Sequence, residues 1–473
     1  MARVLFVQDA LFESFGPQLL SGVLKRAGHE CDLLILACER KGALLERLHR
    51  FRPQFVAFSI SSFGFSWSLA AARVAKSETN AITVFGGPHP TFAPQFALDP
   101  AVDFACRGEG EGAMLDLANT VDAGGDPRTI ANLMFRGDGD GLTTNPLRPL
   151  IEDLDAVPFA DRTLHFAYRT LRELPYKRFM VGRGCPYGCT YCFNKAARTM
   201  YAGGGRYVRH RSPENIVAEI DEVRRRYGIG TVGFVDDCFT TSRTWVLAFL
   251  EVYRREVGLP FTCLTRANEV DEEVAEALGR AGCRFASFGV EVGNEKLRNA
   301  ILDRRMSNEE IVTAARLLHA NGVRFLTYNM FAVPGETAED GLETVRLNAA
   351  IRTDLVGSSV FQPLVGTDSY EYCLREGYLD PTYTVEDYDR ITTGSPLANL
   401  PDRAFLERLQ KLAFLGVHFP RLIPALAVLA RLPLGWAYGL LFKVSVALRF
   451  KVRFHLSWGD VVRLGLRARG RFG

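Results

Sequence analysis

The sequence predicts an α/β protein with two successive parallel-sheet domains and a helical carboxyl-terminal region. The first observation is that short apolar runs alternate with helix-length segments, once before residue 136 and again after residue 172. The second is length, because 473 residues exceed what one hydrophobic core usually organises and indicate about three structural units. The third is a change of composition at residue 403, beyond which the chain is basic and apolar.

The first series of apolar runs, within residues 1–135, predicts an open Rossmann-like sheet of the flavodoxin-like kind. Its strand-length runs cover residues 3–8, 32–36, 55–60, 82–87 and 102–106. Ligands bind such sheets at the loops that follow the carboxyl ends of the strands. The candidate binding residues in those loops are Ser59, Ser61, Gly86, Gly87, His89, Gly108, Glu109 and Glu111. Ordinary turns of a doubly wound domain are the alternative explanation for these loops.

Residues 136–172 predict an extended linker, because few positions are periodic and Pro158 interrupts them. A second alternating series follows, with strand-like runs at residues 176–182, 231–237, 261–266, 284–291, 324–331 and 358–364. These six units predict a partial (β/α)6 barrel of the TIM type over residues 173–385, with functional side chains at the carboxyl ends of its strands. The polar residues at those ends are Asp236, Asp237, Arg266, Glu291 and Asn329.

Three of the ten cysteines, Cys185, Cys189 and Cys192, crowd into eight residues after the first barrel strand. Three thiolates bind three irons of a 4Fe-4S cluster and leave the fourth iron open to a small molecule. A structural zinc site is the alternative, and it needs a fourth ligand, for which Cys238 and His210 are the candidates. The remaining cysteines are scattered, which disfavours a disulfide scaffold and an auxiliary cluster.

The segment GRGCPYGCTYCFN (182–194), with Tyr191 before the last cysteine, resembles the signature of the radical S-adenosylmethionine (radical SAM) superfamily. Further segments resemble later strand motifs of that superfamily, namely FVDDCF (234–239), FGVEVGNE (288–295) and VPGET (333–337). In the first domain, GGPHPTFAP (86–94) and CRGEGEG (106–112) are similar to the cobalamin-binding subfamily. The resemblance covers most of the chain.

The resemblance implies that S-adenosylmethionine chelates the open iron and is cleaved by an electron from the cluster to a 5'-deoxyadenosyl radical. It also implies that the cofactor contacts include Tyr191, Asp236, Arg266, Glu291, Pro334 and Glu336. A buried structural ion pair between Arg266 and Glu291 is the alternative explanation for those two residues. The electron would come from an external donor of the flavodoxin or ferredoxin type.

The resemblance further implies that the first domain binds cobalamin. Many cobalamin domains carry a histidine that ligates cobalt, but Leu11 stands at that position here. His89 is the nearest substitute, although it belongs to a Gly-Pro-rich turn on another loop. The subfamily commonly lacks this histidine, so we expect cobalt without a protein histidine.

The leading hypothesis is a methyltransferase that acts on an unactivated carbon of a small-molecule or lipid-like substrate. One S-adenosylmethionine would methylate cobalamin and a second would yield the radical that abstracts hydrogen from the substrate. The alternative is a radical cyclase, ring-rearranging or oxidative enzyme without methyl transfer. A non-catalytic sensor is disfavoured by the intact cysteine triad, and a methylthiotransferase by the scattered Cys31, Cys38 and Cys106.

The carboxyl-terminal region, residues 386–473, differs in charge from the rest of the chain. From Arg403 onward it holds 13 Lys or Arg against Glu407 and Asp460. Residues 422–442 approach the length of a bilayer span, but Arg431 at the centre disfavours insertion. A segment lying on an anionic membrane is one interpretation, with Lys443, Arg449, Lys451 and Arg453 toward the lipid. A helical cap packed on the enzyme is the other.

The opening MARVLFVQDA lacks the features of a secretory signal. We therefore expect a cytoplasmic protein, or one peripheral at the inner face of the membrane. The chain contains no recognisable nucleic-acid-binding motif, so its basic tail favours anionic lipid over nucleic acid as a partner.

Overall fold

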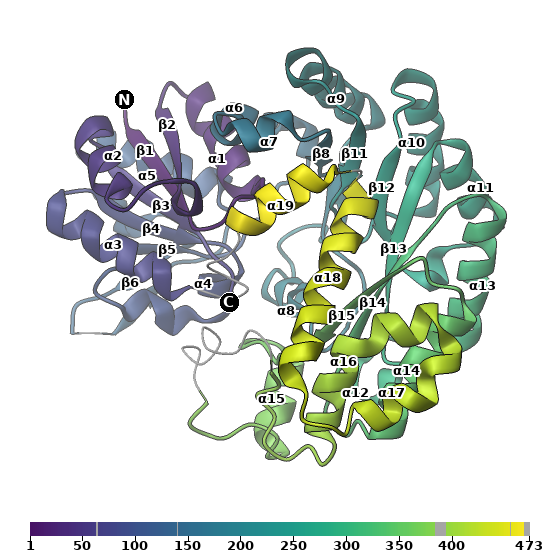
Figure 1. Cartoon of the computed structure of the whole chain (residues 1–473). Coiled ribbons are helices and arrows are strands. Elements are labelled where there is room, and N and C mark those ends of the chain that lie inside the picture. The colour runs from purple at the N-terminus through teal and green to yellow at the C-terminus, as the bar shows by residue number, and fades with distance from the viewer. Residues whose placement is uncertain (63–64, 140, 384–393, 455, 468–473) are drawn as a thin grey trace.

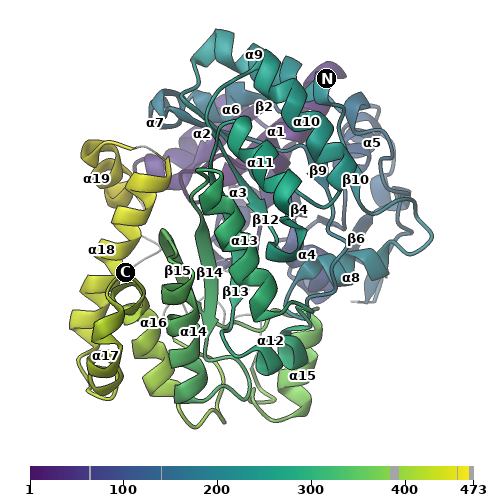
Figure 2. The same ribbon diagram turned by 90° about the vertical axis from the view of Figure 1, so that its right-hand side faces the viewer.

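The structure is a computed structural model that describes residues 1–62, 65–139, 141–383, 394–454 and 456–467. The chain forms an amino-terminal α/β domain, a second α/β domain and a group of carboxyl-terminal helices (Figure 1). The carboxyl-terminal helices run along one side of the second domain in both views (Figures 1 and 2).

Within the described residues the first sheet has the strand order β2-β1-β3-β4-β5-β6-β7. Its strands are β1 (Arg3–Gln8), β2 (Glu30–Ile35), β3 (Phe55–Ser59), β4 (Ile82–Gly86), β5 (Phe104–Cys106), β6 (Leu133–Arg136) and β7 (Leu142–Thr144). The first five are parallel, which confirms the expected open sheet, whereas β6 and β7 continue it as antiparallel strands. β7 lies within residues 136–172, the expected linker. The sequence does not predict this strand, because three residues are too few to show a strand pattern.

Helices cover both faces of this sheet. They are α1 (Phe15–Arg26), α2 (Ala43–Phe51), α3 (Ser66–Glu78), α4 (Pro88–Phe92) and α5 (Glu111–Asp122). α1 packs with α5, and α2 packs with α3. Alternate residues of β1 belong to different buried clusters, Phe6 to one and Val7 to the other. This is the pattern of a parallel sheet that is buried on both faces.

Two short helices, α6 (Arg162–Phe166) and α7 (Arg169–Glu173), join the two domains. The buried guanidinium of Arg162 forms ion pairs with Glu13 at 2.8 Å and with Glu219 at 2.9 Å. Glu13 follows β1 in the first domain, whereas Glu219 lies on a helix of the second. Separating these ion pairs would leave a buried charge without its partner, which is strongly destabilising. This triad therefore ties the domains together.

The second domain contains a parallel sheet with the strand order β15-β14-β13-β12-β11-β8. Its strands are β8 (Tyr176–Phe179), β11 (Thr231–Phe234), β12 (Phe261–Thr265), β13 (Cys283–Glu291), β14 (Leu326–Phe331) and β15 (Leu355–Val360). β8 and β15 are its two edges, so the expected partial barrel is confirmed. A small antiparallel pair, β9 (Gly182–Arg183) with β10 (Arg209–His210), follows β8.

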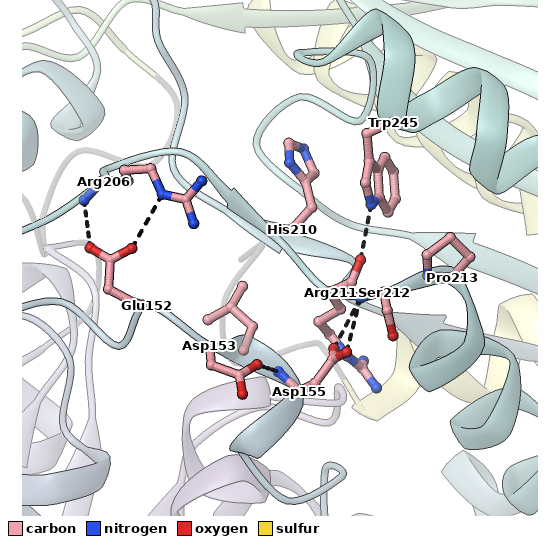
Figure 3. Close-up of a pocket in the computed structure, with 10 residues that line it drawn as sticks. Glu152, Asp153, Asp155, Arg206, His210, Arg211, Ser212, Pro213 and Trp245 are labelled. Carbon is pink, nitrogen blue, oxygen red and sulfur yellow. Dashed lines mark hydrogen bonds and ion pairs between the residues drawn. The ribbon is translucent and has the colours of Figure 1, made fainter.

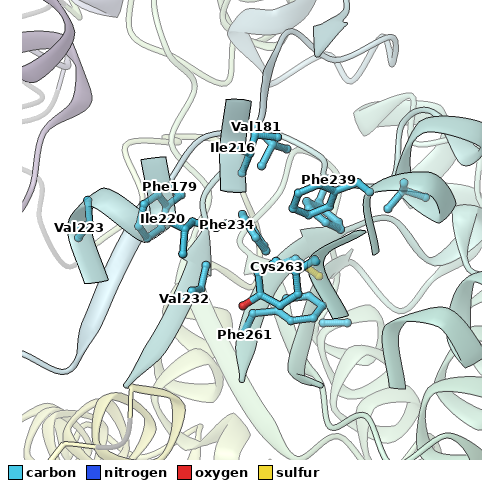
Figure 4. Packing of buried hydrophobic residues seen from close by; sticks show 14 of the residues in the cluster. Phe179, Val181, Ile216, Ile220, Val223, Val232, Phe234, Phe239, Phe261 and Cys263 are labelled. Carbon is cyan, nitrogen blue, oxygen red and sulfur yellow. The ribbon is translucent and has the colours of Figure 1, made fainter. Parts of the chain in front are cut away.

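The helices of the second domain alternate with its strands. They are α8 (Phe193–Met200), α9 (Pro213–Tyr227), α10 (Arg243–Glu256), α11 (Glu272–Arg280), α12 (Glu295–Leu302), α13 (Asn308–Ala320), α14 (Ala338–Ala350) and α15 (Asp368–Arg375). Their apolar faces cover the sheet. For example, Phe179, Phe234 and Phe261 of the strands lie in one buried cluster with Ile216 and Ile220 of α9 (Figure 4). This core holds the strand ends that carry the candidate site.

The carboxyl-terminal region is helical, as expected. It contains α16 (Arg403–His418), α17 (Ile423–Leu429), α18 (Gly435–Phe454) and α19 (Trp458–Arg467). α16 packs on α14 and β15 and buries Leu406, Leu409 and Leu412, so this part is a structural cap. α18 lies against α16. None of the described helices combines the length and the apolarity that crossing a membrane requires.

Candidate active site

The cysteine loop begins beyond the carboxyl end of β8, where Asp236 holds its backbone. Oδ1 of Asp236 accepts hydrogen bonds from the backbone N–H groups of Val181 and Gly182 at 2.9 and 2.6 Å. Burial raises the pKa of Asp236 to about 7 despite these bonds. Its Oδ2 atom is buried and has no hydrogen-bond partner in the described part of the chain. Asp236 therefore shapes the loop that carries the cysteines.

The thiols of Cys185, Cys189 and Cys192 lie close enough to influence one another. Burial, together with the charges of Cys192, Asp237 and Cys189, raises the pKa of Cys185 to about 11. Burial also raises the pKa of Cys192. A cation bound among these thiols would offset both effects, because it favours the thiolate form.

Side-chain donors surround two of the three sulfur atoms. Nη1 of Arg266 donates to Sγ of Cys189 at 3.5 Å, and Nη1 of Arg304 approaches the same sulfur at 3.9 Å. Nδ2 of Asn194 donates to Sγ of Cys192 at 3.6 Å. Hydrogen bonds to sulfur stabilise thiolate ligands and tune the potential of iron-sulfur clusters. The surroundings therefore suit a thiolate-bound cluster.

The two side chains considered as a fourth zinc ligand are engaged elsewhere. Sγ of Cys238 donates to Glu269 at 2.9 Å. The ring of His210 stacks on Trp245 with centroids 4.6 Å apart, and its Nε2 lies 3.2 Å from the Thr241 hydroxyl. Among the residues described, no three His, Cys, Asp or Glu side chains are arranged to hold a single metal ion. The geometry gives the zinc interpretation no support.

Glu291 ends β13 in a left-handed backbone conformation with φ of 65°, which is costly for a residue other than glycine. Its Oε1 accepts a hydrogen bond from the Tyr191 hydroxyl at 3.1 Å and lies 3.7 Å from Nη1 of Arg304. Burial raises the pKa of Glu291, although the charge of Arg304 opposes that shift. Tyr191 thus connects the buried carboxyl group to the cysteine loop.

The suggested ion pair between Arg266 and Glu291 is not formed among the described residues, because Arg304 is the partner of Glu291. The Arg266 guanidinium lies 3.8 Å from the centroid of the Tyr187 ring, and its Nε donates to Asn268 at 2.8 Å. Arg304 comes from the loop between α12 and α13, where no motif marked it. Sequence reasoning therefore missed a residue that contacts both Cys189 and Glu291.

The turn at Pro334 and Glu336 follows β14 and precedes α14. Oε2 of Glu336 accepts a hydrogen bond from the backbone N–H of Val333 at 2.9 Å, whereas its Oε1 is buried without a partner in the described structure. Burial raises the pKa of Glu336 to about 8. The carboxyl group thus stabilises the turn itself, in which Ala332 has a left-handed φ of 61°. Asn329 bonds to Asn348 of α14.

In the first domain, Ser59 and Ser61 are exposed at the carboxyl end of β3. Gly86 ends the neighbouring β4, and a Cβ atom added there would meet nothing within 4 Å. Gly87 differs, because its φ is 98° and an added Cβ would lie 2.7 Å from the carbonyl oxygen of Ile60. Ser59, Ser61 and Gly86 therefore border open space at the edge where such sheets bind ligands, whereas Gly87 shapes the turn.

The ring of His89 is packed inside the first domain and is 1% exposed. It stacks on Phe65 with centroids 4.5 Å apart and meets the ring of Phe96 edge-on. Its Nδ1 atom lies 3.2 Å from the Ser62 hydroxyl. These contacts give His89 a structural role, and Leu11 occupies the loop after β1 where other cobalamin domains place a histidine.

Glu109 and Glu111 face the second domain. Glu109 forms ion pairs at 2.9 Å with Arg183 and with Arg209, and Glu111 pairs with Arg183 at 2.5 Å. The preceding Gly108 has a φ of 69°, and its lack of a side chain makes room for the hydroxyl of Tyr201. This loop therefore docks the two domains together. Arg183 is separated by one residue from Cys185, so the ion pair with Glu109 connects this loop of the first domain to the start of the cysteine loop.

The cysteine loop and the ligand-binding edge of the first sheet meet at one interface. The ring of Phe92, on α4 after Gly86 and Gly87, stacks on the ring of Phe193 with centroids 4.5 Å apart. Phe193 directly follows Cys192. The two regions expected to hold the cluster and cobalamin are thus adjacent in the folded chain.

A cavity of about 490 Å³ lies elsewhere, beside Glu152, Asp155, Arg206 and Trp245 (Figure 3). Arg206 pairs with Glu152, and Asp155 accepts a hydrogen bond from the backbone N–H of Ser212. The lining of the cavity includes His210, which was considered as a zinc ligand, but none of the residues expected to contact the cluster, S-adenosylmethionine or cobalamin.

Two basic residues expected to face a membrane are placed differently. Arg449 donates to the carbonyl oxygen of Val356 at 2.9 Å, and Arg453 donates to the Tyr328 hydroxyl at 2.7 Å. Both partners lie on strands of the second sheet, so the expectation is wrong for Arg449 and Arg453. The residues share one face of α18 because they are four apart, and that face contacts the sheet.

The residues present fit the groups that the resemblance implies. Cys185, Cys189 and Cys192 would hold the cluster, and the open edge at Ser59, Ser61 and Gly86 would admit cobalamin. When bound, the cluster supplies the electron that cleaves S-adenosylmethionine. Asp236 fixes the cysteine loop, and Tyr191, Arg266, Glu291 and Arg304 form the polar wall around it.

Comparison with known proteins agrees with this arrangement. Residues 179–347 match the radical SAM superfamily, and residues 9–118 match the B12 binding domain. An uncharacterized methyltransferase of Pyrococcus horikoshii is 25% identical over 358 residues, which span 75% of each chain. An anaerobic magnesium-protoporphyrin IX monomethyl ester cyclase of Rubrivivax gelatinosus is 24% identical over 371 residues, 74% of this chain and 64% of its own.

The hopanoid C-3 methylase of Methylococcus capsulatus is 26% identical over 373 residues, 76% of this chain and 68% of its own. Among solved structures, the radical S-adenosylmethionine methyltransferase TsrM from Kitasatospora setae, with cobalamin and a [4Fe-4S] cluster bound, superposes with a TM-score of 0.68. It is 18% identical and covers 91% of this chain and 99% of its own, a likeness that shows the shared fold. The chain is a cobalamin-binding, methyltransferase-like enzyme of the radical SAM superfamily, with a 4Fe-4S cluster, S-adenosylmethionine and cobalamin as its cofactors.

Proposed function

We propose that this enzyme transfers a methyl group to an unactivated carbon of a small-molecule or lipid-like biosynthetic substrate by way of a 5'-deoxyadenosyl radical. The observation that supports the proposal is the stacking of Phe92 on Phe193, at 4.5 Å, which joins the candidate cobalamin edge to the cysteine loop. A substrate between the two sites is accessible both to hydrogen abstraction and to methyl donation. Such proximity is what a reaction with two cofactors requires.

The chain's own residues prepare this site. The backbone N–H groups of Val181 and Gly182 donate hydrogen bonds to Asp236, and these bonds hold the cysteine loop at the strand end. Arg266 and Arg304 direct positive charge at Cys189, which stabilises the negative charge of its thiolate. The ion pairs of Glu109 with Arg183 and Arg209 keep the domains docked, which favours a dry interface.

A cyclase, ring-rearranging or oxidative reaction without methyl transfer is the second candidate. It is favoured by the likeness to the anaerobic cyclase of Rubrivivax gelatinosus. The coproducts of S-adenosylmethionine separate the two. Methyl transfer consumes two molecules of S-adenosylmethionine and yields S-adenosylhomocysteine, 5'-deoxyadenosine and methionine in equal amounts, whereas the second candidate yields 5'-deoxyadenosine and methionine without S-adenosylhomocysteine. The assay needs the reconstituted enzyme, a low-potential flavodoxin or ferredoxin as electron donor, and extract from a strain that lacks the enzyme.

The proposal includes peripheral contact with an anionic membrane through α17 and α18. Large apolar side chains are exposed there, with Val428 63%, Trp436 79% and Leu440 59% exposed. Exposed cations lie among them at Arg421, Arg431 and Lys443. The sequence has no acidic residue between Glu407 and Asp460. An anionic bilayer matches both features, since its interior accepts apolar side chains and its surface attracts cations. A lipid-like substrate would be reached from such a position.

A further inference from the structure

α18 inserts side chains into the concave side of the second sheet. Nη1 of Arg453 donates to the hydroxyl of Tyr328 on β14, and the ring of the next residue, Phe454, lies 4.6 Å from that of Tyr176 on β8. β8 is an edge of the sheet, and three strands separate it from β14. One helix end reaches both strands only across the inside of a curved sheet. α18 therefore covers the lateral opening between the two edges of the partial barrel.

A cavity of about 320 Å³ remains between α18 and this inner side. Its walls are Leu326, Tyr328, Asn329, Gly357, Ser358, Ser359, Arg449, Phe450, Arg453 and Phe454. The wall thus includes two guanidinium groups and three hydroxyl groups. It includes no Asp or Glu. A cavity of this composition has a positive potential and offers donors without a matching negative charge.

The two guanidinium groups are incompletely bonded. Arg449 donates to the Val356 carbonyl oxygen and Arg453 to the Tyr328 hydroxyl, and neither forms an ion pair within the described residues. Nε of Arg453 is buried and has no hydrogen-bond partner there. Burial lowers the pKa of Arg449; Tyr328 opposes this shift, and the nearby charge of Arg453 adds to it. Two like charges held half-buried in one cavity cost free energy that a bound anion would recover.

The same contacts have a simpler explanation, in which the arginines only fasten α18 to the sheet. That explanation accounts for one hydrogen bond from each guanidinium, but it leaves the buried Nε and the mutual repulsion uncompensated. An uncharged side chain would fasten a helix at lower cost, because it has no charge to desolvate. A planar guanidinium that presents several donors suits carboxylate or phosphate recognition instead.

We infer that Arg449 and Arg453, with Tyr328 and Ser359, form a binding site for an anionic group, a phosphate or a carboxylate. The inference rests on the proposed function only in taking that group to be part of the substrate. The group would enter the barrel beside α18, and its negative charge would anchor one end of the molecule while the rest extends along the barrel. The enzyme's substrate is then amphipathic or polar at one end and not a plain hydrocarbon.

Thermal unfolding of the full-length protein tests the site without any cofactor. Inorganic phosphate and acetate, each titrated at constant ionic strength, should raise the unfolding temperature if either anion binds the folded state. The anion that stabilises at lower concentration identifies the group. Arg453→Met should weaken the apparent affinity about tenfold or more, because a charge-assisted hydrogen bond is lost. Lys296→Gln, which removes an exposed cation of α12 outside the cavity, should leave the affinity unchanged.

A second variant distinguishes loss of anion binding from loss of protein stability. Tyr328→Phe removes the hydrogen-bond partner of Arg453 but keeps both guanidinium groups, so anion binding should persist even if the protein unfolds at a lower temperature. The inference is overturned if neither anion stabilises the wild type, or if Arg453→Met and Lys296→Gln weaken binding equally. Because no S-adenosylmethionine is present, anion binding is measured independently of methyl transfer. An enzyme that binds anions but transfers no methyl group would refute the proposed function and leave this site intact.

Discussion

Phe92 and Phe193 stack nearly face to face, with ring planes 5° apart and centroids 4.5 Å apart. Phe92 lies on the short helix α4 after the Gly86-Gly87 turn, and Phe193 begins α8 directly after Cys192. The contact joins two loops that are about a hundred residues apart in the chain. It places the candidate cobalamin edge beside the candidate cluster loop.

The cysteine loop should be required for radical formation. Changing Cys185, Cys189 and Cys192 together to Ala should abolish the cluster's visible absorption and the reductive formation of 5'-deoxyadenosine, since the irons lose their thiolate ligands. Cys31→Ala is the matched control, because Cys31 lies on β2 far from the loop in sequence and should keep both signals. A triple variant that still forms 5'-deoxyadenosine would contradict the assignment.

Gly86 should tolerate a side chain in folding but not in cobalamin binding. An added side chain at Gly86 enters open space, so Gly86→Val should leave the circular dichroism spectrum and the unfolding temperature nearly unchanged. It should reduce hydroxocobalamin binding, followed by absorption titration, by about tenfold or more because the larger side chain occupies the ligand's space. Gly141→Val, which also points into open space in the same domain, is the control. Equal binding by the Gly86 and Gly141 variants would contradict the placement.

Glu109 should make the docked domains sensitive to acid. Burial raises the pKa of Glu109, but the hydrogen bond from Arg209 and the charge of Arg183 outweigh this effect and hold its pKa below the usual 4.5. A carboxyl group whose pKa is lowered on folding stabilises the protein above about pH 4.5, and that stabilisation is lost as the pH falls toward the folded value. Glu109→Gln should cost about 1 to 3 kcal/mol at pH 7, since it leaves Arg209 buried without its charge partner.

Urea unfolding at pH 7 and near pH 4 measures this effect. The difference between wild type and Glu109→Gln should shrink at the lower pH, because Glu109 of the unfolded wild-type chain then takes up a proton while the folded protein still holds it charged. Glu152→Gln is the control, because Glu152 is exposed although it is also paired with an arginine, and its substitution should leave stability nearly unchanged at both pH values. A constant difference for Glu109→Gln at both pH values would show that its charge is not responsible.

The exposed side of α18 should bind anionic vesicles. Trp436→Ser combined with Leu440→Ser should lower flotation with such vesicles by about tenfold or more, because each large apolar side chain contributes roughly 1.5 to 3 kcal/mol when fully buried. Lys443→Gln should weaken binding by about 1 kcal/mol and reduce its salt dependence. Val312→Ser on α13, an exposed apolar position remote from the tail, is the control.

Point substitutions are preferable here to removal of residues 403–473. Such a truncation deletes α16, whose Leu406, Leu409 and Leu412 form part of the core, and would unfold the barrel edge. Equal flotation of the double variant and the wild type, or equal binding to neutral and anionic vesicles, would refute the membrane contact.

The strands and the cysteine loop could be predicted because their signals are local. Runs such as residues 55–60 are apolar over a whole strand, which is how a doubly buried parallel strand differs from its surroundings. The spacing of Cys185, Cys189 and Cys192 is likewise contained in eight residues. β7 escaped prediction because three residues, Leu142–Thr144, give no measurable period.

The polar surroundings of the site could not be predicted, because they depend on how distant elements dock. Arg304 approaches Cys189 across 115 positions of sequence, and Arg183 meets Glu109 across 74. Neither pair leaves a mark in a single sequence. His89 shows the converse difficulty, since its place in the loop after a strand made it a candidate binding residue while its ring is packed between Phe65 and Phe96.

In the tail, residues of one basic and apolar stretch lie on two different surfaces of the same helix. Arg449 and Lys443 belong to the same basic, apolar stretch, yet Arg449 bonds to β15 whereas Lys443 is exposed. The four-residue spacing of Arg449 and Arg453 indicates a shared helix face. It does not indicate what that face contacts, because the sheet edge that receives it comes from another part of the chain.

The most direct test of the account is the fate of the methyl group of S-adenosylmethionine. Reconstituted enzyme with cobalamin and an electron donor would be incubated with deuteriomethyl S-adenosylmethionine and extract from a strain that lacks the enzyme. We predict one new product that carries the intact labelled methyl group, and none when the three cluster cysteines are replaced. A new product that forms with 5'-deoxyadenosine but without deuterium would contradict methyl transfer and favour the cyclase or oxidative reaction.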